Sequence, residues 1–339
     1  MLKVSVCITT FNLESYIYQT LDSVLMQDSS FEYEIIVADD GSNDRTREIL
    51  LEYKKLYPDK IILHFQKENV GVNRNDYDLI HLAQGEYIAW CDGDDYWLTK
   101  DKLQKQVDVL DNNPSFSCVH THWVDSYELD GRKQNVTINQ KTWESELKGD
   151  KYVEHFIAGE TSGCRFSSLM CRKSLLLDFL YKDSSILLTV PHKHNDFAIF
   201  CILAFYGPFF LLPEYTTAYR IREVSLSMGN DAEKRINYTL AYLQLLAYLY
   251  SAFDIRMEVL YKAIRRNVAS VLHVMYVNRT NDWTIKICEL TKSVSATGYR
   301  YSLGQKMLIL TIKNKIIYSL THRLFDYLYT RSLTCNSSK

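Results

Sequence analysis

The sequence predicts an α/β protein, in which a mostly parallel β-sheet is flanked by helices and an α-helical region follows. Over residues 1–100, short apolar, β-branched runs alternate with amphipathic segments, which is typical of βαβ units. These runs are apolar throughout, so both faces of the sheet are expected to be covered. From about residue 230 onward the pattern is almost entirely helical.

Four buried strands are expected first, each followed by a polar turn. They are KVSVCIT (3–9), YEIIVADDGS (33–42), KIILHFQ (60–66) and EYIAWCDGDDYW (86–97). Helices are expected between them, among them residues 43–57, which end before Pro58, and residues 74–85, closed by Gly85.

A more mixed order of elements is expected after residue 97. It comprises a helix (98–113) that ends before Pro114, a strand (116–127), a strand and helix (165–180) and a helix (194–207). The last helix begins with Asn195 and Asp196, where the helix dipole favours a carboxylate. Residues 128–160 are polar and irregular, so they are expected to form an insertion or a substrate-facing loop.

The fourth expected strand runs into three carboxylates, Asp92, Asp94 and Asp95. Like charges this close raise one another's pKa unless a cation lies among them. Taken alone, a solvated acidic turn explains the stretch equally well. However, polar clusters also follow the first two strands, at Thr9–Asn12 and Asp39–Ser42, and ligands of open α/β sheets bind beyond the carboxyl ends of strands. A binding site at this edge is therefore favoured.

The composition indicates a reducing compartment. The chain has 339 residues, 47% of them hydrophobic, and a net charge of −2. Its 8 Cys show no C-x-x-C pair and no metal-ligand spacing. Neither a signal peptide nor a run of about 18 uncharged apolar residues is found. These features predict a cytoplasmic protein.

The charge is unevenly distributed along the chain. From residue 261 onward there are 13 Lys and Arg against 3 Asp and Glu, whereas the preceding residues are acidic. Residues 304–331 also place apolar side chains at three- and four-residue steps between basic ones. Such a helix either lies peripherally on an anionic membrane or packs against the protein. The basic residues are spread out and form no recognisable motif, which argues against nucleic acid as a partner.

Five segments occur in the order and spacing of a known enzyme family. They are VSVCITTFN, EIIVADDGSNDRT, NVGVNRN, GEYIAWCDGDDYW and the Asn195–Asp196 pair. On these motifs, residues 1–225 resemble the family 2 glycosyltransferases, and residues 226–339 form a separate helical, basic region. The resemblance implies the GT-A fold, which is a Rossmann-like sheet flanked by helices, and an inverting, metal-dependent sugar transfer.

The resemblance also implies a nucleotide-sugar donor site. It assigns Asp40 to the uracil N3–H and puts Arg74 near the nucleotide. The residues beside the base would be Thr9, Phe11 and Asn12. Alternatively, the Asp39–Ser42 turn caps the following helix. Within this turn, Asp39 is the residue most expected to act only as a cap.

The acidic cluster would bind a divalent cation. The resemblance places Asp94 at the ribose or the metal and Asp95 at the metal, with Asp92 supporting both. Carboxylate oxygens suit Mn²⁺ or Mg²⁺, which would neutralise the departing diphosphate.

Asp196 is the expected catalytic base for the acceptor hydroxyl, although a carboxylate that only caps its helix is the alternative. Trp97, His122 and Trp123 either line the acceptor pocket or belong to the core. The stretch containing His192 and His194 is expected to be a solvated loop and not a metal site.

One position departs from the family pattern. The stretch AYRIREVSLS (218–227) resembles the family's Tyr-Arg-x-His-x-x-Ser, and Arg222 stands in the place of the His. Arg222 could pair with the diphosphate, but the metal would then lose a protein ligand. Ser225 keeps its place and is expected to donate to a phosphate.

The resemblance therefore predicts an inverting hexosyltransferase that moves a sugar from a UDP-sugar to a saccharide acceptor. The acceptor is expected to be lipid-linked, at the cytoplasmic face of the inner membrane, in O-antigen or capsule synthesis. A sugar-phosphate nucleotidyltransferase is one alternative, but it would need a Gly-rich N-terminal loop, and ITTFNLES has no Gly. A non-catalytic sugar-nucleotide-binding or membrane scaffold is the other, and Asp94, Asp95 and Asp196 argue against it.

Overall fold

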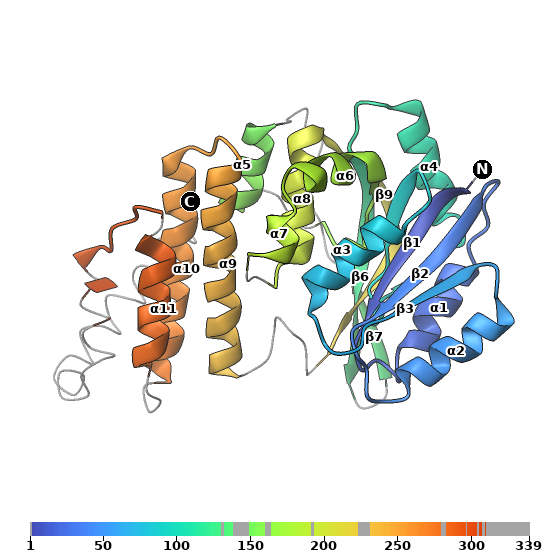
Figure 1. Ribbon diagram of the computed structural model, residues 1–339, viewed down its shortest axis with the longest axis horizontal. Coiled ribbons are helices and arrows are strands. Elements are labelled where there is room, and N and C mark those ends of the chain that lie inside the picture. The colour runs from blue at the N-terminus through green and yellow to red at the C-terminus, as the bar shows by residue number, and fades with distance from the viewer. Residues whose placement is uncertain are drawn as a thin grey trace.

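The computed structural model describes most of the chain. Figure 1 shows an elongated molecule, with the sheet and its helices at one end and a row of C-terminal helices at the other. The described residues are 2–129, 132–137, 149–159, 164–190, 193–222, 231–278, 283–295, 297–303, 305–306 and 309.

The N-terminal part is built around one mixed sheet. Its strands are β1 (Leu2–Thr10), β2 (Glu32–Asp39), β3 (Ile61–Phe65), β4 (Tyr87–Trp90), β5 (Tyr96–Trp97), β6 (Cys118–Leu129), β7 (Arg132–Thr137), β8 (Met170–Arg172) and β9 (Phe209–Ile221). Within the described residues the order is β3-β2-β1-β4-β8-β6-β9-β5, and β7 pairs with β6 outside this path. β3, β2, β1 and β4 are parallel, and β8 is antiparallel to β4 and β6. The expected α/β sheet that begins with βαβ units is confirmed.

Helices cover both faces of this sheet. They are α1 (Ile17–Leu25), α2 (Thr46–Leu56), α3 (Val72–Leu82), α4 (Lys102–Asn112), α5 (Asp150–Ala158), α6 (Lys173–Lys182), α7 (Ser185–Leu188) and α8 (Asn195–Tyr206). A 3₁₀ turn, Phe166–Ser168, precedes β8.

Side chains of the central strands alternate between two hydrophobic cores. Val4, Val6 and Ile8 of β1 pack in a core with residues of α1, α2 and α4. Cys7 of the same strand faces the larger core, which includes residues of α3 and α5–α8. Because successive strand residues point to opposite faces, a strand that is apolar throughout can fill both cores.

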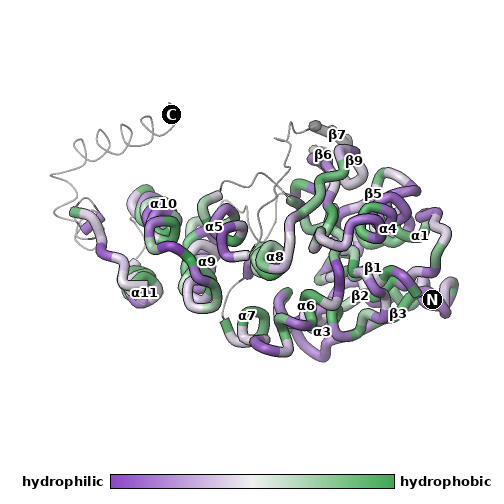
Figure 2. The backbone as a smooth tube through the Cα atoms, turned by 90° about the horizontal axis from the view of Figure 1, so that it is seen from above, coloured by the Kyte–Doolittle hydropathy of each residue, from purple (hydrophilic) through white to green (hydrophobic). Residues whose placement is uncertain are grey.

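The C-terminal part is helical, as expected. It contains α9 (Ala232–Ala252), α10 (Met257–Val277) and α11 (Thr284–Ser295). Figure 2 shows these helices beside α5, on the far side of α8 from the sheet. Leu246, Leu272 and Leu290 belong to the same hydrophobic cluster as Cys7 of the sheet. The helices and the sheet are therefore joined by a continuous core.

α5 links the helical part to the sheet part. Arg256 Nε lies 2.8 Å from Glu154 Oε2, and the Asp254 amide donates to Asp150 Oδ1 at 3.1 Å. The Glu154 side chain is 5% exposed and that of Arg256 is 71% exposed, so this ion pair lies at the solvent-facing edge of the contact. The expected domain boundary near residue 225 falls outside the described residues.

Residues 128–160 are more regular than expected. They include the end of β6, β7 and α5, so the expectation of an irregular insertion or loop is wrong for these segments. The apolar residues of α5 are spaced so that Tyr152, Val153, Phe156 and Ile157 face the larger core. This apolar face spans only two helical turns and is flanked by polar residues, so the helical periodicity was not recognised in the sequence.

Gly85 does not close a helix. α3 ends at Leu82, and a Cβ atom on Gly85 would lie 2.6 Å from the Ser5 nitrogen. The glycine is therefore required for close approach of this turn to β1.

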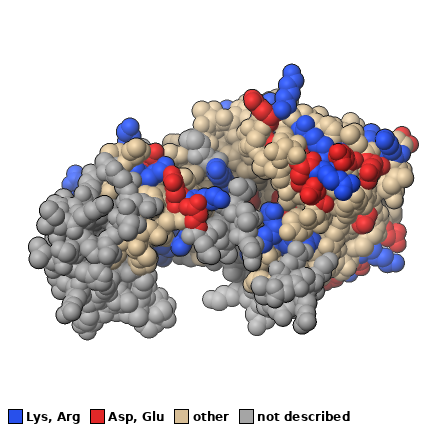
Figure 3. Space-filling model, turned by 90° about the horizontal axis from the view of Figure 1, so that it is seen from below, with Lys and Arg blue, Asp and Glu red and all other residues tan. Residues whose placement is uncertain are grey.

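On the face drawn in Figure 3, Lys and Arg side chains of the sheet part stand beside Asp and Glu side chains. Among the described residues, no helix has both the length and the apolarity needed to cross a membrane. The amphipathic segment expected over residues 304–331 lies, apart from three of its residues, outside the described part of the chain.

Candidate active site

Backbone hydrogen bonds bring the three predicted polar clusters together at one edge of the sheet. The Asp40 amide donates to Thr10 O and the Gly93 amide to Thr9 O, each at 2.9 Å. Thr9 Oγ1 donates to Asp92 Oδ1 at 3.4 Å. The turns after β1, β2 and β4 thus form one continuous surface, as parallel strands require.

Gly93 is the residue that lets the acidic turn approach β1. A Cβ atom at this position would lie 2.7 Å from Thr9 O and 2.9 Å from Leu13 Cδ1. A larger residue would push the Asp92–Asp95 turn away from Thr9, so the glycine between the carboxylates has a steric role.

Asn12 connects the first two turns. Its φ is +53°, a left-handed conformation that Asn tolerates better than most residues. Its amide donates to Ser42 Oγ at 2.8 Å, and its Oδ1 accepts from the Asn43 amide at 3.0 Å. Phe11, beside it, is 44% exposed and therefore lies at the rim of the site.

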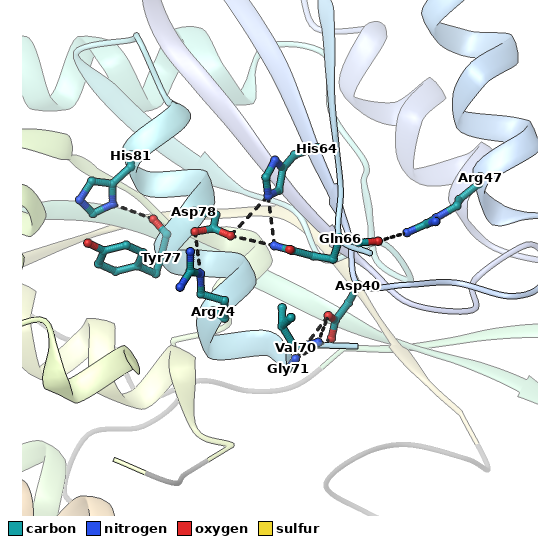
Figure 4. Close-up of polar contacts among 10 residues, drawn as sticks. All are labelled: Asp40, Arg47, His64, Gln66, Val70, Gly71, Arg74, Tyr77, Asp78 and His81. Atoms are coloured by element: carbon teal, nitrogen blue, oxygen red, sulfur yellow. Dashed lines mark hydrogen bonds and ion pairs between the residues drawn. The ribbon is translucent and has the colours of Figure 1, made fainter. Parts of the chain in front are cut away.

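Asp40 holds the segment before α3, as Figure 4 shows. Its Oδ1 accepts from the Val70 amide at 2.7 Å, and its Oδ2 from the Gly71 amide at 3.0 Å. The side chain is 5% exposed, and burial raises its pKa. Asp39 holds the turn, because its Oδ1 accepts from the Ser42 amide at 3.1 Å. The expected capping of the following helix is wrong, because α2 has Arg45 at its N-cap position and no side-chain cap hydrogen bond.

Arg74 points along α3. Its Nε lies 2.9 Å from Asp78 Oδ1, and the side chain is 53% exposed. Figure 4 places this pair in a network in which Gln66 and His64 also contact Asp78. A nucleotide would therefore have to share Arg74 with Asp78.

Asp95 is fixed inside the protein. Its Oδ2 accepts from Ser167 Oγ at 2.6 Å and its Oδ1 from the Arg220 amide at 2.9 Å. The residue is 1% exposed. Both carboxylate oxygens thus join the acidic turn to β9 and to the 3₁₀ turn.

Asp94 is more accessible, and Arg222 already neutralises one of its oxygens. Arg222 Nη2 lies 2.6 Å from Asp94 Oδ2, with side-chain exposures of 24% and 20%. Arg220 Nε donates to the Asp94 carbonyl at 2.6 Å. Both guanidinium groups lie over the ring of Tyr16, which keeps them beside the acidic turn.

The acidic turn concentrates negative charge in a desolvated place. Burial, and then the charge of Asp94, raises the pKa of both Asp92 and Asp95. Asp196 also raises the pKa of Asp92, which shows that the carboxylate at the start of α8 lies within electrostatic reach of the turn. The predicted base therefore lies within electrostatic reach of Asp92, which belongs to the same turn as the two predicted metal ligands.

Asp196 begins α8 and is partly exposed. Its Oδ1 accepts from the Phe197 amide at 2.7 Å. The preceding Asn195 donates through Nδ2 to Asp76 Oδ2, and Asp76 is fully buried on α3. This contact ties the first turn of α8 to α3 and so positions Asp196 against the sheet.

The residues present suit a divalent cation that is completed by substrate. Among the described residues, no three His, Cys, Asp or Glu side chains are arranged as a metal cage. Asp94 Oδ1 accepts no hydrogen bond from a described residue, and the charge of Asp94 raises the pKa of Asp92 and Asp95, a repulsion that a bound cation would relieve. Mg²⁺ in phosphate sites usually needs only one or two carboxylates plus phosphate oxygens and water.

The structure decides most of the remaining assignments. Trp97 belongs to the core, where its Nε1 donates to Ser167 O. His194 is buried and its ring lies 3.9 Å from that of Tyr238, so the expectation of a solvated loop is wrong for this residue. Its partners are aromatic rings of α9, which the sequence places far away. Ser225 and His192 lie outside the described residues.

Sequence reasoning missed several residues of the site. Ser167, Arg220 and Tyr16 orient the acidic turn, and Asp76 orients α8. Arg220 lies in the same family-like stretch as Arg222, so the sequence offered a reason to consider it. Nothing in the sequence indicated a site role for Ser167, Tyr16 or Asp76, because their partners are distant in the sequence.

The match to a protein family covers the sheet part of the molecule. The model described as Glycosyl transferase family 2 matches residues 5–173, which run from β1 to the start of α6 and include the acidic turn.

Curated relatives match over part of their length. TuaG of Bacillus subtilis strain 168, whose name assigns it to teichuronic acid biosynthesis, is 40% identical over 107 residues, 32% of this chain and 41% of TuaG. An uncharacterized protein of Mycobacterium tuberculosis H37Rv, Rv1520, is 39% identical over 147 residues, 43% of this chain and 42% of that protein. The chain thus spans less than half the length of these relatives.

Solved structures with this fold are glycosyltransferases of the GT-A type. TarS 1–349 of S. aureus, solved with UDP-GlcNAc, is 20% identical with a TM-score of 0.54, covering 87% of this chain and 80% of that one. The mannosyltransferase PcManGT of Pyrobaculum calidifontis, solved with GDP-Man and Mn²⁺, is 16% identical with a TM-score of 0.51, covering 96% and 83%. Together with the family model, the acidic turn and the fold show that the chain belongs to the family 2 glycosyltransferases.

Proposed function

We propose that the protein is an inverting glycosyltransferase that moves a sugar from a UDP-sugar to a hydroxyl of a saccharide acceptor. The proposed setting is synthesis of a cell-surface polysaccharide on a lipid-linked acceptor. Family membership supports the transfer, the name of TuaG supports the setting, and the UDP-GlcNAc complex of TarS supports the donor class.

One observation carries the proposal. The acidic turn Asp92–Asp95 lies beside the turns of Thr9 and Asp40 at the carboxyl edge of the sheet, and Asp196 is within electrostatic reach of its Asp92. An inverting transfer needs a charged site for the diphosphate and, on the acceptor side of the sugar, a base. The arrangement offers both.

Asp94 would hold the divalent cation, Mn²⁺ or Mg²⁺, and Asp95 would either ligate it or fix Asp94 through the turn. A cation at this place stabilises the negative charge of the departing diphosphate. Arg222 would move from Asp94 to the diphosphate when the donor binds, because phosphate oxygens accept a bidentate guanidinium well. Ser225 is proposed to donate to the same phosphates.

Thr9, Phe11, Asn12 and Asp40 would receive the nucleoside, with Arg74 at its edge. Asp196 would take the proton from the acceptor hydroxyl as that oxygen attacks the sugar C1. Its partial exposure at the start of α8 leaves it accessible to an acceptor.

A thermal-shift panel tests the donor assignment. Unfolding would be followed with UDP, GDP, dTDP and CDP, each with and without Mn²⁺. A ligand at 100 times its Kd stabilises the native state by about 2.7 kcal/mol, which is a readily measured rise in Tm. We expect a Mn²⁺-dependent rise with UDP alone.

A rise with GDP alone would replace UDP in the proposal and leave the reaction class unchanged. No rise with any nucleotide, together with no hydrolysis of UDP-sugars, would contradict the catalytic proposal and favour a non-catalytic scaffold. A variant with an exposed acid replaced, Asp59→Ala, serves as the control because it should respond as the wild type does.

A further inference from the structure

Arg165 is held between two aromatic rings beside the proposed active site. Its guanidinium carbon lies 4.0 Å from the centre of the Tyr219 ring and 5.1 Å from that of Trp123. Trp123 comes from β6 and Tyr219 from β9, which are adjacent parallel strands. The two rings therefore fix the position of the guanidinium without neutralising it.

The charge of Arg165 has no partner in the described part of the chain. Its Nε is buried without a hydrogen-bond acceptor, and no described residue forms an ion pair with it. Arginine presents five N–H donors in a planar fork. Because unsatisfied buried donors are unfavourable, an arginine kept in this state beside a substrate site indicates a missing anionic ligand.

The hydroxyl groups of Tyr219 and Tyr238 add further donors at this place. Neither forms a hydrogen bond to a described residue. Tyr238 comes from α9, and its hydroxyl lies within electrostatic reach of Asp196, Tyr219 and Arg165. Burial raises the pKa of Tyr219 to about 12, so this phenol is a neutral donor at physiological pH.

The position of this group separates it from the nucleoside. In the sheet order β3-β2-β1-β4-β8-β6-β9-β5, the turns of Thr9 and Asp40 follow β1 and β2, and the acidic turn follows β4. Trp123 and Tyr219 lie beyond β4, on β6 and β9. Asp196, which faces the acceptor in the proposed reaction, is on the same side as Tyr238.

We propose that Trp123, Arg165, Tyr219 and Tyr238 form an acceptor subsite that binds an anionic group, a phosphate or a carboxylate, of the saccharide that receives the sugar. Arg165 supplies the charge and two parallel N–H donors, and the tyrosines supply hydroxyl donors and a face for the sugar ring. This inference rests on the proposed function, because it takes Asp196 as the base that faces the acceptor.

Acceptor selectivity is the first test. Transfer would be measured to two acceptors that differ only in charge, a methyl glycoside and its phosphate monoester. We expect kcat/KM to favour the phosphorylated acceptor by about tenfold or more, which is the usual effect of one charge-assisted hydrogen bond. Arg165→Gln should abolish this preference by raising KM for the phosphorylated acceptor far more than for the neutral one.

Matched variants separate charge from structure. Arg165→Lys should keep part of the preference, because it keeps the charge but not the fork. Arg45→Gln removes an exposed arginine that lies outside the subsite, paired with Glu48 of α2, and should behave as the wild type. Equal preference in the wild type and in Arg165→Gln would overturn the proposal.

A second test requires no turnover. The ¹⁵N resonance of Arg165 Nε, assigned by its loss in Arg165→Lys, would be followed while inorganic phosphate is added at constant ionic strength. The protein would first be saturated with UDP and Mg²⁺, so that phosphate cannot enter the donor site. We expect a saturable shift with phosphate and none with chloride; no shift with phosphate would overturn the proposal.

The donor diphosphate is the rival ligand of Arg165, and the two tests distinguish it. If Arg165→Gln weakened UDP binding by as much as acceptor binding, the guanidinium would belong to the donor site and the proposal would fail. Failure of the proposed function has a different signature, namely no nucleotide binding and no hydrolysis of UDP-sugars in the wild type. A phosphate shift at Arg165 in that case would still support an anion-binding subsite.

Discussion

Arg222 Nη2 lies 2.6 Å from Asp94 Oδ2, so a guanidinium stands against the carboxylate that is proposed to hold the cation. Arg222 also lies over the ring of Tyr16, beside Arg220. A cation and Arg222 would therefore compete for Asp94. Arg222, which departs from the family pattern, thus forms an ion pair with the acidic turn, and replacing it should change the affinity for the cation.

Arg222→Gln is expected to strengthen Mn²⁺ binding in the absence of nucleotide. Loss of a partly exposed ion pair releases Asp94 and is worth up to about 1 kcal/mol, or roughly fivefold in Kd. The same variant should weaken UDP binding, because the diphosphate loses a cationic partner. Titration calorimetry with Mn²⁺ and then with UDP measures both effects. Unchanged Mn²⁺ affinity would mean that Arg222 and the cation do not share Asp94.

Asp196→Asn is expected to lower the rate of transfer by about 10²–10⁴-fold while UDP binding stays the same. The amide oxygen of Asn can still accept from the Phe197 amide, so the first turn of α8 should remain intact. Steady-state kinetics together with UDP titration separates the two quantities. Retained turnover would leave Asp196 as a helix-capping residue only.

Asp40→Ala is expected to lower the free energy of unfolding by about 1–3 kcal/mol, because the Val70 and Gly71 amides lose their acceptor. UDP binding should fall as well, since the segment before α3 borders the nucleoside site. Urea unfolding and UDP titration measure the two effects. A stability loss with normal UDP affinity would assign Asp40 to the loop alone.

Lys102 should make stability depend on pH. It is fully buried, donates to Gln106 Oε1 at 2.6 Å and lies 4.4 Å from the Trp97 ring, and burial lowers its pKa to about 7. Between pH 7 and the ordinary lysine pKa of about 10.4, the unfolded state binds more protons than the native state, so stability should rise with pH.

Lys102→Met is expected to remove this rise, which reaches at most about 1.4 kcal/mol per pH unit. The variant should be more stable than the wild type at pH 6, and this advantage should shrink towards pH 10. Urea unfolding over this pH range measures the difference, with the exposed Lys100→Met as a control. Parallel curves for wild type and Lys102→Met would show that the buried amine is charged at all these pH values.

The first strands and the polar turns could be predicted because their signals are local. An apolar run of five to nine residues followed by Asp, Asn or Gly indicates a strand and its turn without knowledge of any partner. β1, β2 and β3 accordingly lie within a few residues of their expected positions. α5 and the long strand β9 were not predicted, because their apolar residues are interrupted by polar ones and acquire meaning only against α8 and β6.

The sequence by itself determined the α/β fold class, the acidic turn after the fourth strand and the family resemblance. These features depend on the types of neighbouring residues and their short spacing along the chain, so they can be recognised without knowing any tertiary contact. Only the tertiary structure decided how the acids are held: Asp95 is bound by Ser167 and Arg220, which lie 72 and 125 positions away. The same holds for the rings that enclose Arg165. Contacts between distant residues depend on how the whole sheet is assembled, and no local pattern in the sequence encodes them.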